Sequence, residues 1–439
     1  MSQNAAAARI LRATIFHTPR NPFQSGDALE SFVDGGLVIQ GGKIAACGDY
    51  AAVRAAYSDA SVTDLRGGFL LPGLVDAHTH FPQIRVLGGL GKQLLEWLEQ
   101  IALPEEARMS DVNYACTTAQ RFMHAMASHG TTAAMVFGAH FPGATAALFQ
   151  AAEKSGLRIA SGLVLSDRGL RPDLLQTPEA AYRESSALIR QFHGRGKLLY
   201  AVTPRFAVST TGAMLEVCQS LVRENPGVRF QTHINENRQE VEEVARLFPE
   251  TKDYLAVYER FGLVDRRAVL AHNLHAGNAE LQRLAASGAV VAHCPSSNAV
   301  LGSGYFSMRA HLDAGVPFAL GTDVGAGTGF GIFKEALQAH LLQRLAPQGI
   351  PLEPSHLLYL ATRAGAEALR LDNEIGDFTP GKAADFVYWK APAGSPLELA
   401  LEGANELDRV LSAILTLADS TCVREVRVAD VVVFRSESS

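Results

Sequence analysis

Short apolar runs alternate with longer segments of helical periodicity through the middle of the chain. The eight runs are FLLPGLVDAHTHF, TTAAMVFG, RIASGLVLSD, LLYAVTPRF, VRFQTHINEN, AVLAHNLHA, AVVAHCPSSN and PFALGTDVG. Between them, segments such as DVNYACTTAQRFMHAMASHG and NAELQRLAASG are predicted helices, and the latter ends on a helix-terminating glycine. Strand–helix alternation indicates a parallel sheet with crossover helices. Eight such repeats predict an α/β fold, a (β/α)8 TIM-type barrel with insertions.

The two ends of the chain carry a different pattern, with shorter predicted strands. GGLVIQGGKIAACGDY indicates two strands joined by a Gly-Gly turn. ADFVYWK and VREVRVADVVVF alternate apolar and polar residues, and FTPGKAAD has the composition of turns. Because neither end suffices for a core, we expect both to form one small β-sandwich domain. The predicted division is 1–68 and 378–439 for that domain and 69–377 for the barrel.

Composition narrows the class of protein. The 439 residues are 47% hydrophobic and 19% charged with a net charge of −6, which indicates a globular protein without a basic face for nucleic acid. No apolar run approaches the roughly 20 residues of a membrane helix, and the N-terminus lacks a signal-peptide pattern. The five cysteines show no CxxC spacing and are expected to be reduced thiols in the cytoplasm.

Histidines and an aspartate stand where the predicted barrel strands end, the position at which barrel enzymes carry catalytic groups. In PGLVDAHTHFPQ, His78 and His80 are two residues apart, so an extended backbone directs both side chains to one face. His233, His272 and Asp323 end the fifth, sixth and eighth predicted strands. Any one of these histidines alone is better explained as an ordinary buried residue. Their shared position favours a metal centre.

The expected ligands indicate which metal and which chemistry. Nitrogen and carboxylate ligands suit Zn²⁺, and Fe²⁺ or Mn²⁺ less exclusively. Such an ion lowers the pKa of a bound water from 15.7 to about 7. Glu236, three residues after His233, could carry a proton between water and substrate. The alternative for Glu236 is a helix N-terminal residue that the helix dipole favours.

The motifs PGLVDAHTH, THINEN, HCPSSN and GTDVG resemble the amidohydrolase superfamily, specifically its mononuclear deaminase branch. The resemblance covers nearly the whole chain and includes GDFTPGKAADFVYW, which is similar to the family's return into the small β domain. Binuclear members carry a bridging lysine at the fourth strand, whereas VTPRF has none, so one metal is expected per chain. HTHFPQ, LLEWLEQIALPEEAR, TPRFAVS, THINENRQEV and AHCPSSN are further similar to the guanine deaminase family.

This resemblance implies zinc-dependent hydrolysis of guanine to xanthine and ammonia in purine catabolism, by a cytoplasmic homodimer that could also use Fe²⁺. The implied metal ligands are His78, His80, His233 and Asp323. The implied catalytic residues are Glu236, His272 and Asp323. The implied purine contacts are Gln83, Arg205, Phe206 and His272. Trp97 is expected either to wall the pocket or to be an ordinary packed helix aromatic.

The chemistry of guanine agrees with these contacts. Its O6 accepts a hydrogen bond that an arginine can donate, its N1–H donates, and a glutamine amide does both. Two alternatives stay open. The site could deaminate another aminated heterocycle, such as 8-oxoguanine, a pterin or a triazine, although TPRF with HTHFPQ favours guanine. The chain could also be a catalytically dead, amidohydrolase-like binding protein, which the complete set of ligands disfavours.

Overall fold

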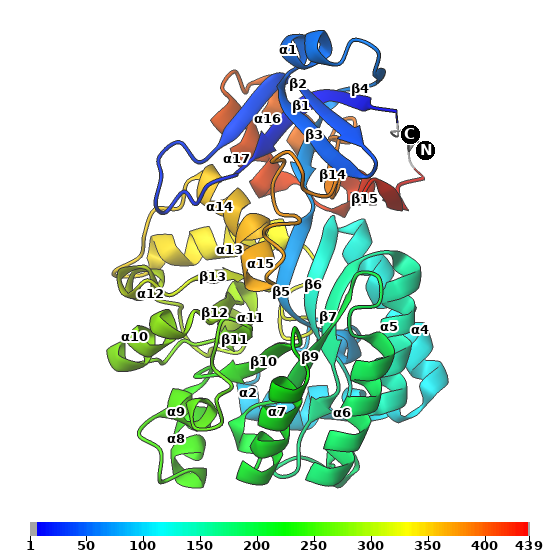
Figure 1. The fold of residues 1–439 in the computed structure, drawn as a ribbon. Coiled ribbons are helices and arrows are strands. Elements are labelled where there is room, and N and C mark those ends of the chain that lie inside the picture. Colours follow the sequence, from blue (N-terminus) through cyan, green and yellow to red (C-terminus); the bar gives the residue numbers. More distant parts are fainter. Residues whose placement is uncertain (1–6, 438–439) are drawn as a thin grey trace.

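A computed structural model describes residues 7–437 of the chain. It contains a parallel barrel and, above it in Figure 1, a mixed sheet built from both chain ends. The barrel strands are β5 (Leu74–His80), β6 (Thr131–Phe137), β7 (Arg158–Gly162), β9 (Leu198–Pro204), β10 (Arg229–Ile234), β11 (Ala268–His272), β12 (Val290–His293) and β13 (Phe318–Leu320). Beside them, the short β8 (Val164–Leu165) pairs with β9. Each of the eight strands lies in one predicted apolar run, so the predicted barrel is confirmed.

Helices follow the strands and cover the outside of the barrel. They are α4 (Val112–Ser128), α5 (Pro142–Ser155), α6 (Pro178–Phe192), α7 (Gly212–Glu224), α8 (Arg238–Leu247), α9 (Tyr254–Glu259), α10 (Asn278–Ser287), α11 (Pro295–Val300), α12 (Met308–Ala314), α13 (Ile332–Leu345), α14 (Pro354–Ala361) and α15 (Arg363–Ala368). Both predicted helices form. The Asp111 side chain caps the start of α4, and α10 ends at Gly288 in the left-handed conformation, φ +72°.

The long connection from β5 to α4 contains five short helical turns. They are η1 (Phe81–Gln83), α2 (Leu94–Trp97), the π-helical turn η2 (Leu98–Ala102), α3 (Leu103–Ala107) and η3 (Arg108–Ser110). This connection leaves β5 at its carboxyl end. In Figure 1, β5 runs from the mixed sheet down into the barrel, so the carboxyl ends of the parallel strands lie far from that sheet.

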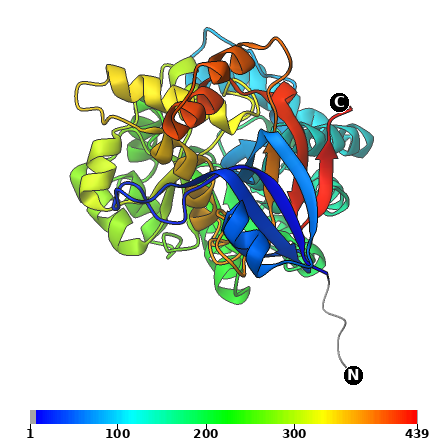
Figure 2. The same ribbon diagram turned by 90° about the horizontal axis from the view of Figure 1, so that it is seen from above.

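The chain ends form one seven-stranded mixed sheet in the order β16-β15-β14-β4-β1-β2-β3. Its strands are β1 (Arg9–His17), β2 (Glu30–Gln40), β3 (Lys43–Asp49), β4 (Ser61–Pro72), β14 (Phe386–Trp389), β15 (Val423–Val428) and β16 (Val431–Arg435). Pairing of β14 with β4 joins the two ends, which lie side by side in Figure 2. The small β domain formed by both ends is therefore confirmed. The boundaries at residues 68 and 377 stay a prediction; β4 continues past the first of them.

The predicted Gly-Gly turn lies between β2 and β3. Gly41 and Gly42 adopt φ +59° and +77°, values that suit a two-residue hairpin turn and that glycine adopts without strain. Three further helices accompany the mixed sheet in sequence: α1 (Tyr50–Ala56), α16 (Pro396–Glu402) and α17 (Leu407–Leu417).

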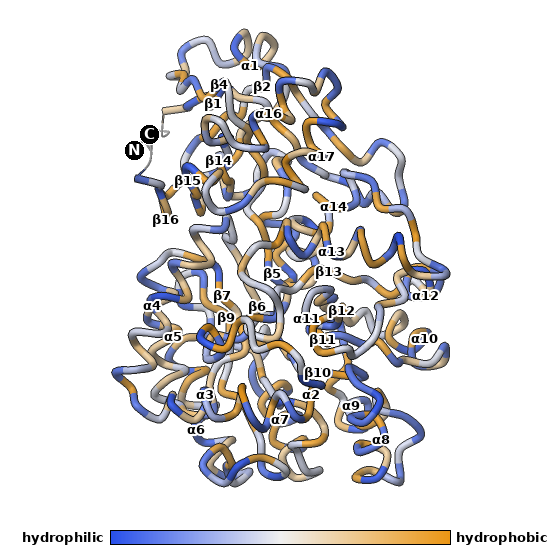
Figure 3. The backbone as a smooth tube through the Cα atoms, turned by 180° about the vertical axis from the view of Figure 1, so that it is seen from behind, coloured by the Kyte–Doolittle hydropathy of each residue, from blue (hydrophilic) through white to orange (hydrophobic). Residues whose placement is uncertain are grey.

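Hydrophobic residues follow the barrel strands and the inward sides of the helices, whereas α8 and the outer connections are largely hydrophilic (Figure 3). Large side chains such as Phe149, Tyr200, Phe230 and Tyr258 are fully buried between the strands and the helices. Across residues 7–437, no helix combines the length and apolarity required to cross a membrane.

The barrel closes between β5 and the segment that follows β13, and Asp76 holds this seam. Its carboxylate accepts hydrogen bonds from Thr322 N (3.0 Å), Thr322 Oγ1 (2.5 Å) and His78 N (3.1 Å). Main-chain Asp323 N adds a bond to His78 O at 2.9 Å. Burial raises the pKa of Asp76 to about 7, because these hydrogen bonds replace only part of its lost hydration.

We expect Asp76→Ala to lower the free energy of unfolding by about 2–5 kcal/mol, because each buried donor left unsatisfied costs about 1–3 kcal/mol. Urea unfolding followed by circular dichroism measures the change. Asp313→Ala, at an exposed position of α12, is the matched control. Equal unfolding free energies for the two variants would show that Asp76 does not hold the seam.

Candidate active site

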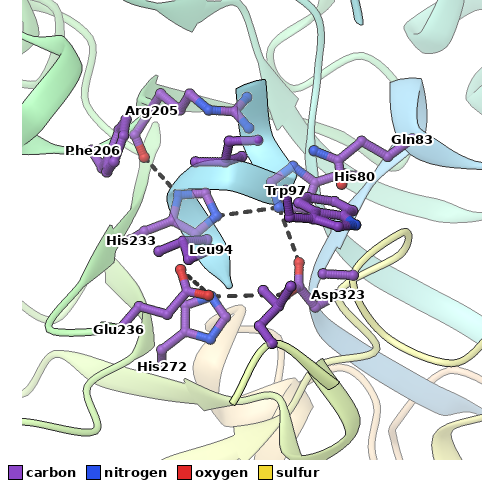
Figure 4. Close-up of a pocket in the computed structure, with 13 residues that line it drawn as sticks. His80, Gln83, Leu94, Trp97, Arg205, Phe206, His233, Glu236, His272 and Asp323 are labelled. Atoms are coloured by element: carbon purple, nitrogen blue, oxygen red, sulfur yellow. Dashed lines mark hydrogen bonds and ion pairs between the residues drawn. The ribbon is translucent and has the colours of Figure 1, made fainter. Parts of the chain in front are cut away.

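A pocket lies at the carboxyl ends of the barrel strands and is closed on one side by the β5–α4 connection. Its lining residues are His80, Gln83, Leu94, Trp97, Leu98, Arg205, Phe206, His233, Glu236, His272, Leu301, Asp323 and Ala326 (Figure 4). Every predicted site residue except His78 lines this pocket, and His78 lies directly behind, with its Nε2 3.1 Å from that of His80. The structure therefore brings the whole predicted set together.

The four predicted metal ligands lie close together around His78 and His80. His80 Nε2 lies 3.1 Å from His78 Nε2 and 3.2 Å from His233 Nε2. Asp323 Oδ1 lies 3.3 Å from His78 Nε2 and 3.2 Å from His80 Nε2. All four side chains are buried. Figure 4 shows His80, His233 and Asp323 pointing toward one another.

This spacing fits a divalent ion. Zinc binds imidazole nitrogen at about 2.0–2.1 Å, which places tetrahedral ligands about 3.3–3.4 Å apart. Burial lowers the pKa of His80 to about 4 and that of His233 well below its ordinary value, so both rings offer a lone pair. Neutral imidazole nitrogens at such short separations fit rings that bind one shared cation.

A second, overlapping group of metal-type side chains contains Cys294. Ligand atoms of His78, His272, Cys294 and Asp323 lie within 4.8 Å of one another. Burial raises the pKa of the Cys294 thiol well above its ordinary value, so the thiolate that a metal would need is disfavoured. The nitrogen-rich set is the better match.

Backbone and amide oxygens orient two of the histidines. His233 Nδ1 lies 2.6 Å from the Arg205 carbonyl oxygen, so Nδ1–H donates and Nε2 is free to face the ligand cluster. His272 Nδ1 lies 2.9 Å from Asn298 Oδ1, which likewise leaves Nε2 as an acceptor. Within residues 7–437, His272 Nε2 has no hydrogen-bond partner, and it lies 3.4 Å from Glu236 Oε2. A water molecule would satisfy it.

Glu236 occupies a buried position beside His272. Burial raises the pKa of its carboxyl well above the ordinary value, and the neighbouring Glu240 and Asp323 raise it further. Glu240 fixes the main chain here by accepting from Glu236 N at 2.9 Å and Asn237 N at 3.2 Å. Glu236 therefore combines a fixed backbone with a carboxyl whose raised pKa favours its protonated form.

Four residues at or next to the site, Asn235, His272, Asn273 and Asp323, adopt a left-handed backbone that residues other than glycine rarely take. Among them, the φ angles are +49° at Asn235, +74° at His272 and +48° at Asp323. Such strain persists where surrounding contacts determine the conformation, and it concentrates at functional positions. The left-handed conformation of Asp323 also explains how its carboxylate reaches the site, although β13 ends three residues earlier, at Leu320.

Another part of the pocket lining combines two polar side chains with apolar residues. Arg205 and Gln83 both contact the buried carboxylate of Glu106. Phe206 and Trp97 pack with Leu94, Leu98 and Leu301 in one cluster. Trp97 thus walls the pocket and is also a packed helix residue, so the two alternatives weighed for it do not exclude each other.

Three site residues were missing from the sequence-based set: Glu106, Asn298 and Glu240. A local signal existed for Glu240, because Asn237 and Glu240 have the spacing of a helix-capping box, and the structure forms it. Glu106 contacts Arg205, which lies 99 positions away in the sequence, and Asn298 contacts His272, which lies 26 positions away. No short-range sequence pattern predicts either contact.

Comparisons with known proteins agree with this geometry. Residues 69–433 match the amidohydrolase family, and residues 35–60 match a bacterial imidazolonepropionase-like composite domain. The chain is 54% identical to a probable guanine deaminase of Deinococcus radiodurans over 98% of its length and 99% of that protein.

Solved structures give the same result. The E. coli guanine deaminase superimposes with a TM-score of 0.94 at 36% identity, covering 98% of this chain and 100% of that one. A guanine deaminase from C. acetobutylicum with bound guanine in its active site superimposes with a TM-score of 0.89 at 26% identity, covering 97% and 100%. The chain therefore belongs to the amidohydrolase family and, within it, to the guanine deaminase family.

Proposed function

We propose that this protein hydrolyses guanine to xanthine and ammonia at the barrel pocket, with one zinc ion held by His78, His80, His233 and Asp323. The observation that carries the proposal is the presence of this ligand cluster and the Gln83–Arg205 pair in one buried pocket. The first group supports water activation, and the second supports recognition of a purine edge. Membership of the guanine deaminase family supports the same substrate.

When bound, the metal supplies Lewis-acid activation of a water molecule. His272 Nε2 and the Asp323 carboxylate orient that water toward C2 of the ring; the two groups lie 3.8 Å apart. Glu236 gives a proton to the ring nitrogen beside C2, so negative charge does not accumulate there. As the C2–O bond forms and the C2–N bond breaks, the two protons of the water convert the departing amine to ammonia and restore the proton that Glu236 gave to the ring; Glu236 or Asp323 carries them. Guanine and water thereby give xanthine and ammonia.

The purine is held by the wall opposite Glu236. Arg205 donates to O6, the Gln83 amide exchanges hydrogen bonds with the ring edge, and the Phe206 ring packs against the base. His272 lines the same pocket from the side of the metal-ligand cluster. The aliphatic residues and Trp97 exclude bulk water from the reacting groups, which strengthens these polar contacts.

The same family membership supports three further parts of the proposal. Zinc is the resident ion and Fe²⁺ the alternative, because both accept nitrogen and carboxylate ligands. The protein acts in the cytoplasm, where its five free cysteines stay reduced. It functions as a homodimer, which size-exclusion chromatography with light scattering tests directly.

We expect purified protein to convert guanine to xanthine, seen as an absorbance change, and to turn over a triazine, which lacks the O6 and N1–H edge, at least about 10²-fold more slowly; 8-oxoguanine and a pterin keep that edge and are assayed beside guanine as competing substrates. A site that hydrogen-bonds a specific edge rejects mismatched ligands strongly. Faster turnover of another heterocycle would replace guanine as the substrate. Absence of turnover with every compound, despite one bound metal per chain, would support the binding-protein alternative.

A further inference from the structure

We propose that Glu106 is a positioning residue that fixes which donor and acceptor atoms Gln83 and Arg205 present to the purine; the inference rests on the proposed function. Glu106 lies on α3, in the β5–α4 connection, and is buried to 3% exposure. Its Oε1 accepts from Gln83 Nε2 at 2.7 Å and from Arg205 Nη1 at 2.9 Å. Its Oε2 accepts from Arg205 Nη1 at 2.7 Å. One carboxylate thus holds both recognition side chains.

Two neighbouring side chains stabilise the ionised form of this carboxylate. Arg205 is buried to 3% exposure and would be an uncompensated cation without Glu106. His140 Nε2 lies 3.3 Å from Glu106 Oε2. Burial alone would raise the pKa of Glu106, but Arg205 and His140 outweigh burial and hold that pKa well below its ordinary range. Glu106 is therefore an ionised group that accepts hydrogen bonds and donates none.

An acceptor at this position determines which way the Gln83 amide faces. Its NH₂ group must face Glu106, and its Oε1 then accepts from Gly325 N at 3.0 Å. Reversal of the amide would place oxygen against carboxylate and NH₂ against N–H, which loses both hydrogen bonds. One N–H and one lone pair of Gln83 remain for a ligand, in a fixed order.

This fixed order provides discrimination between purines. Guanine presents the O6 acceptor beside the N1–H donor, whereas a 6-aminopurine presents a donor at position 6. Arg205 and the held amide match the first pattern and leave unpaired donors against the second. A carboxylate that merely neutralised Arg205 would stabilise the fold without affecting how tightly guanine binds, so the KM for guanine distinguishes the two roles.

The test is Glu106→Gln, which keeps the shape but provides an amide that both donates and accepts. Its matched control is Glu105→Gln on the same helix, where Glu105 contacts Arg108 and Tyr114 outside the pocket. We expect kcat/KM for guanine to fall about 10²-fold, mostly through KM, because misplacement of positioning groups by about 1 Å has an effect of this size. Metal content stays at one ion per chain in both variants.

A double-mutant cycle with Arg205→Met separates positioning from folding. The double variant carries no uncompensated charge, so it measures the loss of Glu106 without leaving an unpaired guanidinium in the pocket. If Glu106 acts through Arg205 and Gln83, its replacement has a much smaller effect in the Arg205→Met background than in the wild type. Equal effects in both backgrounds, or equal kcat/KM for Glu106→Gln and Glu105→Gln, would overturn the inference. Absence of guanine turnover by the wild type would instead refute the proposed function.

Discussion

Glu236→Gln is expected to reduce kcat for guanine by about 10²–10⁴-fold while the metal stays bound, which is the usual contribution of a positioned general acid–base group. The replacement preserves shape and hydrogen bonding but cannot give or take the proton that the ring nitrogen requires. Glu236 is 3% exposed, so bulk water has little access to replace it as a proton carrier. Steady-state kinetics and metal analysis on the same preparation measure both parts of the prediction.

The control for this variant is Glu242→Gln, an exposed glutamate on α8 that should leave kcat unchanged. Full turnover by Glu236→Gln with one bound metal would remove Glu236 from proton transfer and leave His272 or Asp323 as the carrier. Loss of metal from Glu236→Gln would show that Glu236 supports the ligand cluster.

The fold could be predicted because barrel strands covered on both faces are continuous apolar runs, which contrast with the mixed patterns of the helices. Strand ends were less accurate. Asp323 was placed at the end of the eighth strand, yet β13 stops at Leu320 and a left-handed backbone at Asp323 turns the carboxylate inward. Backbone turns of this kind depend on tertiary contacts, such as the Asp323 N to His78 O bond across the seam.

The site likewise contains residues that could be predicted from the sequence and residues that could not. His78, His80 and His233 could be found because a positional rule links strand ends to chemistry. Glu106 could not, although its segment LLEWLEQIALPEEAR was noted, because its meaning depends on the distant Arg205. A residue whose role is to position a distant side chain has no characteristic sequence spacing or local composition by which it could be recognised.

Removal of the metal has the second large expected effect. Treatment with a chelator, or His80→Ala, should lower guanine turnover by at least about 10³-fold, because no side chain of the pocket replaces an ion that shifts the pKa of water from 15.7 to about 7. The melting temperature should fall as well, since a ligand that binds only the native state adds about 4 kcal/mol at a thousandfold excess over its Kd. Metal analysis, kinetics and calorimetry on the same samples follow all three quantities.

Two controls make the result of this experiment interpretable. Zinc added back should restore turnover and melting temperature to the chelated wild type but not to His80→Ala, whose ligand set is incomplete. His124→Ala, at an exposed position of α4, should behave as the wild type throughout. If the chelated protein kept its turnover, the His78–His80–His233–Asp323 cluster would not be a catalytic metal site. Its short nitrogen separations would then be explained by N–H···N hydrogen bonds between neutral rings.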